Sequence, residues 1–159
     1  MIEPYTAVAL QTPHHNCQTQ EDWDKNLDVI CEAMDAAIWL AALQYPVKLV
    51  ALGEAAIQTF ADSKLGFDHA TAANEWFNEF PGPELDRLRK KAQEHQTFIV
   101  GQCRARDSKL HPDRYFNLAF ILDPKGKTLG HVAVFCYPDR LILDTTRGQA
   151  TPLIEHLDR

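Results

Sequence analysis

Two short apolar runs on either side of one long amphipathic segment constrain the fold more than any other feature of this sequence. The runs 5–11 (YTAVALQ) and 47–52 (VKLVAL) are rich in residues that favour β-strands. Between them, apolar side chains recur at spacings of three and four residues, which is typical of a helix with one buried stripe about five turns long. The stripe comprises Trp23, Leu27, Ile30, Cys31, Met34, Ile38 and Ala41. Strand, helix and strand in this order predict a βαβ unit with parallel strands and a right-handed crossover.

A second amphipathic segment, residues 84–95 (ELDRLRKKAQEH), follows Pro83, a residue that is favourable in the first turn of a helix. Its predicted inward side chains are Leu85, Leu88 and Ala92. The connection 61–83 that precedes it is long and contains a short helical patch at 76–80. Because long connections in compact domains often carry function, we expect this one to border a site.

Further strands are predicted at 97–102 (TFIVGQ) and 115–122 (YFNLAFIL), with the polar loop 104–113 between them. The turn 123–126 (DPKG) ends in a glycine, which can adopt positive φ, so 115–122 and 127–134 should pair as a β-hairpin. A parallel unit followed by an antiparallel hairpin predicts an α/β fold, with one mixed β-sheet and helices on one face.

Composition excludes several classes of partner. The 159 residues are 45% hydrophobic and suffice for one core, and 22 acidic against 16 basic residues give a net charge of -6. Without a long run of Lys or Arg, we expect neither nucleic acid nor an anionic membrane surface as a partner. The sequence lacks a signal-peptide pattern and an apolar run of roughly 18 residues, which predicts a cytoplasmic protein. Asp28, Glu32 and Asp35, opposite the apolar stripe, are expected to face solvent.

The cysteines do not predict a metal site or a disulfide scaffold. Cys17, Cys31, Cys103 and Cys136 are widely spaced and form no CxxC pair, so buried thiols are the simplest interpretation. His14, His15 and Cys17 lie close in sequence but lack a fourth ligand and the spacing of a closed zinc site. We therefore expect neither a metal nor another cofactor.

Glu54 is the strongest candidate for a functional residue. It follows the buried strand 47–52 directly, and α/β enzymes place working groups at the carboxyl ends of such strands. A structural role is the alternative, in which the carboxylate caps a turn or binds backbone amides.

The order of motifs resembles the N-terminal half of a carbon-nitrogen hydrolase, the nitrilase and amidase superfamily. The matching pieces are VALQTP, LVALGEAAIQTF, the PGP that opens a helix, TFIVGQ and YFNLAFILDPKGK. The resemblance implies part of a four-layer αββα sandwich and hydrolysis of non-peptide C–N bonds in small amides, nitriles or carbamoyl compounds. It also implies a cysteine nucleophile, a glutamate general base and a lysine that stabilises developing charge. Glu54 falls at the general-base position, although the family more often has proline where this chain has Gly53.

The other two groups of that mechanism are missing where the resemblance places them. Counting from Gly126 puts Val134 at the lysine position, and the Cys-aromatic-Asp elbow of the nucleophile does not occur. Cys136 lies only two residues past the lysine position. The sequence therefore divides into residues 1–131, the N-terminal part of a carbon-nitrogen hydrolase domain, and a divergent tail, 132–159, with the second half of the fold missing.

Three hypotheses for function follow from this pattern. The first is a truncated hydrolase that is inactive by itself, because only Glu54 of the three groups is present. The second is a regulatory or binding module that associates with a full-length homologue or with a complementing chain that supplies the missing half. The third is a working hydrolase with relocated groups, in which Cys136 is the nucleophile. Apart from these hypotheses, the resemblance implies a homo-oligomer, because members of the family commonly associate through their helical layers.

Overall fold

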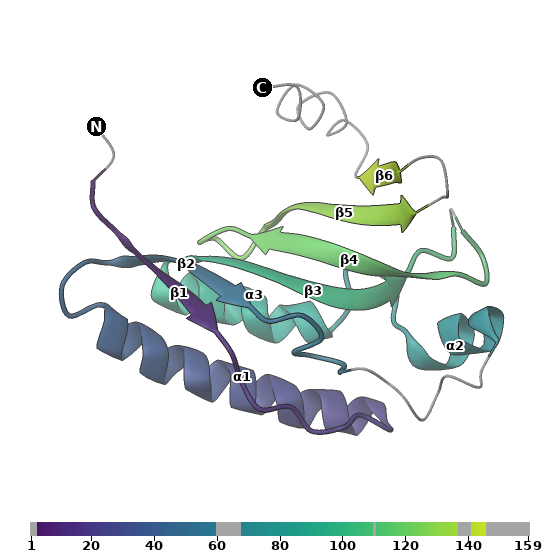
Figure 1. Ribbon diagram of the computed structural model, residues 1–159, viewed down its shortest axis with the longest axis horizontal. Coiled ribbons are helices and arrows are strands. Elements are labelled where there is room, and N and C mark those ends of the chain that lie inside the picture. Colours follow the sequence, from purple (N-terminus) through teal and green to yellow (C-terminus); the bar gives the residue numbers. More distant parts are fainter. Residues whose placement is uncertain (1–2, 60–67, 110, 137–140, 146–159) are drawn as a thin grey trace.

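The computed structural model describes residues 3–59, 68–109, 111–136 and 141–145, with side chains described up to residue 130. Figure 1 shows a single sheet with α1 and α3 side by side on one face and α2 at one end. In chain order the elements are β1 (Thr6–Leu10), α1 (Gln20–Ala41), β2 (Val47–Leu52), α2 (His69–Trp76), α3 (Glu84–His95), β3 (Phe98–Arg106), β4 (Tyr115–Leu122), β5 (Thr128–Cys136) and β6 (Leu141–Thr145). None of the described helices combines the length and the apolar character that a membrane span requires.

The six strands lie in the order of the sequence, β1-β2-β3-β4-β5-β6. β1 pairs with β2 and β2 with β3 in parallel, whereas the later pairs are antiparallel. This confirms the predicted βαβ unit, the hairpin and the mixed sheet. Because Leu10 lies opposite Leu52, the carboxyl ends of the two parallel strands meet at one edge of the sheet.

The core lies between the two long helices and the sheet. The predicted apolar stripe of α1 is buried except at Ala41, which is partly buried against the core. The three predicted inward residues of α3 are fully buried. They pack against strand residues such as Val50, Ile99 and Phe120. Each such side chain contributes about 1.5–3 kcal/mol when fully buried, so this layer stabilises the fold.

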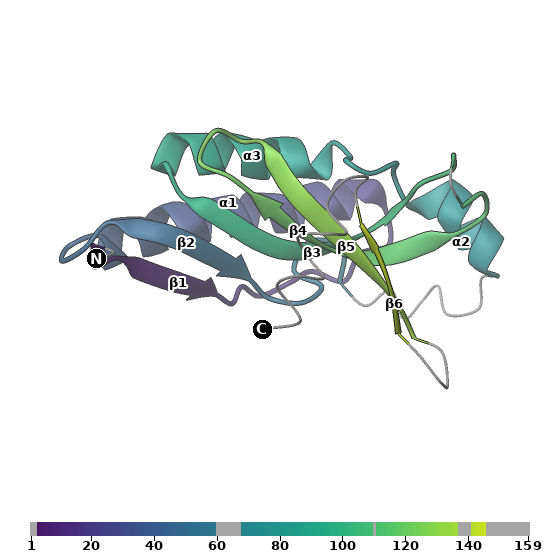
Figure 2. The same ribbon diagram turned by 90° about the horizontal axis from the view of Figure 1, so that it is seen from above.

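The opposite side of the sheet, which we call the open face, carries side chains that are much more exposed. Register pairs Leu49 with Phe98 and Val100 with Ile121, so these four side chains share that face. Phe98 is 38% exposed and Ile121 is 43% exposed. Figure 2 shows α1 and α3 on the other side of the strands. These four residues therefore form an apolar part of the open face that the described helices leave uncovered.

Two predicted boundaries are wrong. The helical patch predicted at 76–80 lies earlier, as α2, because the Asp68 carboxylate accepts hydrogen bonds from the amides of Ala70 and Thr71 at 3.0 Å and starts the helix there. The predicted loop 104–113 starts too early, because β3 pairs with β4 as far as Arg106. β6 is an additional strand within the region predicted as a divergent tail. The predicted connection at 61–67 lies outside the described residues.

The close contact between Gly101 and the core predicts that a methyl group added at this position destabilises the fold. A Cβ at Gly101 would lie 2.7 Å from the ring of Phe120, which is only 1% exposed and has no room to move. We expect Gly101→Ala to lower the free energy of unfolding by about 1–3 kcal/mol in urea titrations. Gly53→Ala is the control, since its nearest contact would be at 3.9 Å. Equal stabilities of the two variants would contradict this packing.

Candidate active site at the carboxyl ends of the parallel strands

Glu54 lies immediately beyond β2, at the edge where the two parallel strands end. It lines a depression of about 460 Å³ together with residues from the ends of β1 and β2. The polar residues of this lining are Gln11, Thr12, His14 and Glu54. The Glu54 side chain is exposed and, among the described residues, has no hydrogen-bond or ion-pair partner. The structural role considered for Glu54, capping a turn or binding amides, thus has no bond to support it in the described part of the chain.

The turn that carries Glu54 is, in contrast, firmly attached. Residues 55–59 are buried. The Gln58 side chain donates to the carbonyl of Arg104 at 2.8 Å and accepts from its amide at 2.5 Å. The Asn26 amide donates to the carbonyl of Ile57 at 3.1 Å. A pinned backbone thus presents an unpaired carboxylate to the depression.

Asn26 is a functional support that the sequence did not reveal. It is only 1% exposed, although the apolar stripe of α1 gives no reason to bury an amide there. Besides Ile57, it donates to the His15 carbonyl at 3.1 Å and accepts from the His15 amide at 2.8 Å. It therefore joins α1, the loop after β1 and the Glu54 turn. The only feature of the sequence that could have indicated this role is the place of Asn26 within the apolar stripe, three residues after Trp23.

The described cysteines are not placed to act beside Glu54. None of the described residues that line the depression is a cysteine or a lysine. Cys17, Cys31 and Cys103 are buried free thiols. Burial raises the pKa of each of them, which disfavours the thiolate that a nucleophile requires. Cys136 is the last residue of β5, where its backbone pairs with Leu141.

The lysine position predicted from the family lies within β5. Val134 occupies it, and its backbone pairs with Leu143 of β6. Lys125 and Lys127 belong to the turn between β4 and β5, where their amides donate to the Asp123 carboxylate at 2.9 and 2.8 Å. The structure therefore leaves Glu54 without a lysine among the described residues of its depression.

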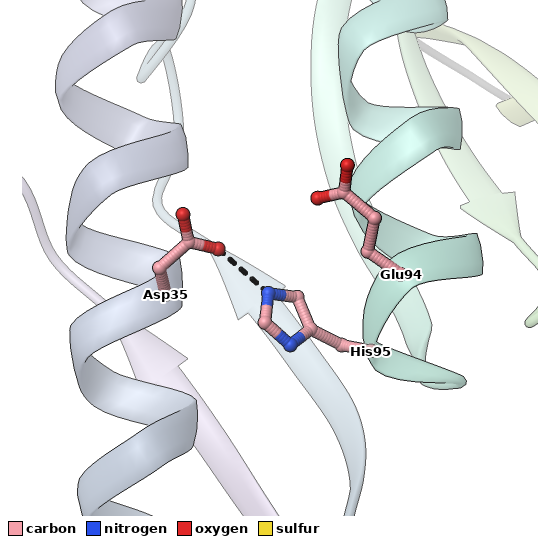
Figure 3. A group of neighbouring side chains, drawn as sticks. All are labelled: Asp35, Glu94 and His95. Carbon is pink, nitrogen blue, oxygen red and sulfur yellow. Dashed lines mark hydrogen bonds and ion pairs between the residues drawn. The ribbon is translucent and has the colours of Figure 1, made fainter.

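Among the described residues, His14, His15 and Cys17 form no ligand cluster, and the one group with metal-ligand atoms close together lies elsewhere. Asp35, Glu94 and His95 have ligand atoms within 4.8 Å of one another (Figure 3). Lys91 lies among them, with its ammonium 2.7 Å from Asp35 and 3.0 Å from Glu94. His95 Nε2 lies 2.6 Å from Asp35 Oδ1. A side-chain cation thus already balances these carboxylates, and the group acts as an ionic link between α1 and α3.

This link corrects the expectation that one face of α1 is only solvated. Asp28 pairs with Arg87 and Asp35 with Lys91, and both partners belong to α3. Burial by itself would raise the pKa of Asp35, but hydrogen bonds from Lys91 and His95 outweigh it and lower that pKa. Two of the three predicted surface carboxylates therefore hold the helices together.

A second carboxylate, Glu84, is buried at the start of α3. It is 4% exposed, and its Oε2 accepts a hydrogen bond from Asn78 at 3.2 Å. Its Oε1 has no partner among the described residues. Burial raises the pKa of Glu84. Since Glu84 does not line the depression, it is a structural group and not part of the candidate site.

The fold and the site together define an α/β protein with a candidate catalytic carboxylate at the end of a parallel strand. The sequence model of the carbon-nitrogen hydrolases matches residues 6–134, so the chain belongs to the carbon-nitrogen hydrolase family. No curated protein sequence matches the chain.

Solved structures share the fold at low sequence identity. A crystal structure of an N-terminal amidase with an Asn-Glu-Ala peptide aligns at 13% identity and TM-score 0.61, covering 83% of this chain and 28% of that one. A carbon-nitrogen hydrolase from Helicobacter pylori G27 aligns at 18% identity and TM-score 0.61, and the alignment covers 85% of this chain and 41% of that one. An amidase from Nesterenkonia sp. aligns at 18% identity and TM-score 0.55, and the alignment covers 82% of this chain and 43% of that one. The chain thus spans less than half the length of these proteins.

The buried Glu84 predicts a stability that falls as pH rises. Because its pKa is higher in the folded state, the folded protein retains a proton that the unfolded chain loses above about pH 4. This part of the stability is present below that pH and is lost as pH rises through the folded-state pKa. In urea titrations, Glu84→Gln should therefore have a free energy of unfolding about 1–3 kcal/mol higher than that of wild type at pH 8. This gain in stability should shrink at pH 4. A gain that does not vary with pH would contradict the raised pKa.

The link between α1 and α3 predicts the opposite pH dependence. The lowered pKa of Asp35 means that its contribution is present above about pH 4 and is lost as pH falls through the folded-state pKa. Because the Asp35 side chain is 46% exposed, solvent screening limits the loss in Asp35→Asn to about 0.5–1 kcal/mol at neutral pH. The loss should diminish in about 1 M salt. Glu32→Gln, on the exposed part of the same helix, is the control and should show neither effect in urea titrations.

Proposed function

We propose that this chain carries the general base, Glu54, of a hydrolase that cleaves non-peptide C–N bonds in small amides, nitriles or carbamoyl compounds. The observation that carries the proposal is an unpaired, exposed carboxylate on a pinned turn beside a depression. Membership of the carbon-nitrogen hydrolase family supports the choice of bond. The volume of about 460 Å³ suits a small-molecule substrate.

The chemistry assigned to Glu54 is proton transfer in two steps. In the first step with an amide, its carboxylate takes the proton of a cysteine thiol while sulfur attacks the substrate carbon, and returns that proton to the nitrogen that leaves. With a nitrile, the proton goes to the nitrile nitrogen and a thioimidate forms, from which a first water molecule releases ammonia and leaves the thioester. In the second step, it takes a proton from water, whose oxygen attacks the thioester, and passes that proton to the departing sulfur, so that the acid and the thiol are released and the carboxylate is regenerated. A lysine ammonium stabilises the negative charge that develops on the substrate heteroatom in both steps.

Turnover by this mechanism requires a lysine and a cysteine from a further segment, on this chain or on another. The described lining of the depression contains neither residue. The apolar open face supports the same conclusion, because a sheet with exposed Phe98 and Ile121 is suited to packing against a second layer. The greater length of the structurally similar proteins is consistent with such a layer.

This proposal predicts that the purified chain does not release ammonia from simple amides or nitriles. The reason is the absence of a nucleophile beside Glu54 in the described lining. Ammonia release would be followed with acetamide-like and benzonitrile-like substrates, with wild type and Glu54→Gln in parallel. Release by wild type that disappears in Glu54→Gln would contradict the need for a further segment.

A small added thiol should replace the missing nucleophile in part and expose the role of Glu54. With a short-chain acyl p-nitroanilide as substrate, we expect the chain to accelerate thiol-dependent release of nitroaniline by about tenfold over buffer, a small part of what a positioned general base contributes. Glu54→Gln should abolish this acceleration. Glu75→Gln, which changes an exposed glutamate of α2, is the control and should retain it. An acceleration that survives in Glu54→Gln, or none in wild type, would contradict the general-base role.

A further inference from the structure

The turn that carries Glu54 contains two residues in an uncommon backbone conformation. Ala55 has φ of 56° and Thr59 has φ of 53°, both in the left-handed region that side chains with a Cβ adopt rarely. Such residues persist only where surrounding contacts hold them, and they concentrate at functional sites. Contacts that fix these two residues therefore fix the direction in which Glu54 points.

One side chain on the open face holds the first of these residues. Gln102 of β3 accepts a hydrogen bond from the Ala55 amide through Oε1 at 2.9 Å. Its Nε2 donates to Oδ1 of Asn117 on β4 at 3.1 Å, which fixes the orientation of the Gln102 amide. Because Ala55 directly follows Glu54, the plane of the peptide between them is set by Gln102.

A second side chain holds the other residue and meets the first at the same asparagine. Arg104 donates to the Thr59 carbonyl at 2.7 Å. It also donates through Nε to Oδ1 of Asn117 at 3.3 Å. Asn117 Oδ1 therefore accepts from both supports, and a continuous chain of polar side chains runs from Ala55 to Thr59 across two strands.

We propose that Gln102, Asn117 and Arg104 are positioning residues for the general base, and that they act by fixing both left-handed residues of the Glu54 turn. The inference rests on the proposed function, which it deepens. A general base contributes most when the backbone that carries it is fixed close to the position from which it can reach the substrate. This network supplies that constraint from the sheet, while the Glu54 side chain itself stays without a bond in the described part of the chain.

The direct test is amide hydrogen exchange at Ala55 in the full chain. Gln102→Met keeps the length of the side chain but removes the acceptor, so exchange at Ala55 should quicken about five- to tenfold, as for the loss of one hydrogen bond. Gln102→Glu keeps the acceptor oxygen for the Ala55 amide but loses the donor to Asn117, so its exchange rate should lie between those of wild type and Gln102→Met. Gln93→Met, which loses a 2.8 Å hydrogen bond to the Lys125 carbonyl, is the matched control and should leave Ala55 unchanged.

Asn117→Ala provides a second route to the same result. Its side chain is exposed on β4, so the fold tolerates its loss, yet both supports lose their shared acceptor. Exchange at Ala55 should again quicken, with the melting temperature close to that of wild type. Unchanged exchange at Ala55 in both Gln102→Met and Asn117→Ala would overturn the inference.

Thiol-dependent release of nitroaniline separates this inference from the function on which it rests. In Gln102→Met the rate at saturating anilide should fall several-fold while the anilide KM stays constant, and Gln102→Glu, which keeps the acceptor for Ala55, should restore part of the rate. A rate that depends on Glu54 but not on Gln102 would overturn the positioning role and leave the proposed function intact. If wild type showed no Glu54-dependent rate, the proposed function would fail, and exchange at Ala55 would still decide whether the network fixes the turn.

Discussion

The two hydrogen bonds between the Gln58 side chain and the backbone of Arg104 are the interaction on which the candidate site depends. β2 pairs with β3 only as far as Ala51 and Val100, so the β3 edge beyond that point needs other partners. Gln58 satisfies the amide and the carbonyl of Arg104 in the manner of a strand residue. Two residues further on, the Arg106 amide donates to the Asn78 carbonyl at 2.9 Å, and the Arg106 carbonyl accepts from the Phe80 amide at 2.9 Å. Each buried backbone group left without a partner costs about 1–3 kcal/mol. Moving the Glu54 turn away from β3 would leave the amide and the carbonyl of Arg104 unpaired, and this cost keeps the turn against the sheet.

The helices and strands that are marked by a regular pattern of apolar residues were predictable from the sequence. Apolar spacing located α1 and α3, and short, mostly apolar runs located β1, β2 and β4, because burial of a helix stripe or a strand imposes those patterns. Glu54 as a candidate followed from its place after β2, and its catalytic role stays a prediction. The division of the chain at residues 131 and 132 also stays a prediction.

The supports of the turn were not predictable in the same way. Gln58 and Arg104 are 46 residues apart, and nothing local in either segment indicates that one side chain completes the hydrogen bonds of the other. Asn26 sits within an apolar stripe, where a period-based argument has no place for an amide. The acidic residues Asp28 and Asp35 were expected to face solvent because a charged face normally does, whereas the packing of α3 supplies partners for both. Long-range polar contacts depend on the assembled fold, and apart from the place of Asn26 within an apolar stripe the sequence carries no signal for these.

The open face divides into two chemically different parts, and this division relates the fold to the site. Leu49, Phe98 and Ile121 form an apolar part, which is suited to covering by another layer. Gln102, Arg104 and Asn117 form a polar part next to the Glu54 turn.

The two glutamates near the sheet show why position decides which carboxylate can work. Glu84 is buried, receives a hydrogen bond from Asn78 and lies under a glycine whose Cβ would come within 2.8 Å of its oxygens. No substrate can reach it there, and its raised pKa is a consequence of that burial. Glu54 has the reverse environment, with an exposed side chain, a depression in front of it and a turn whose backbone is held by α1 and β3. A general base must reach its proton donor without being released from its scaffold, and of these two carboxylates only Glu54 meets both conditions.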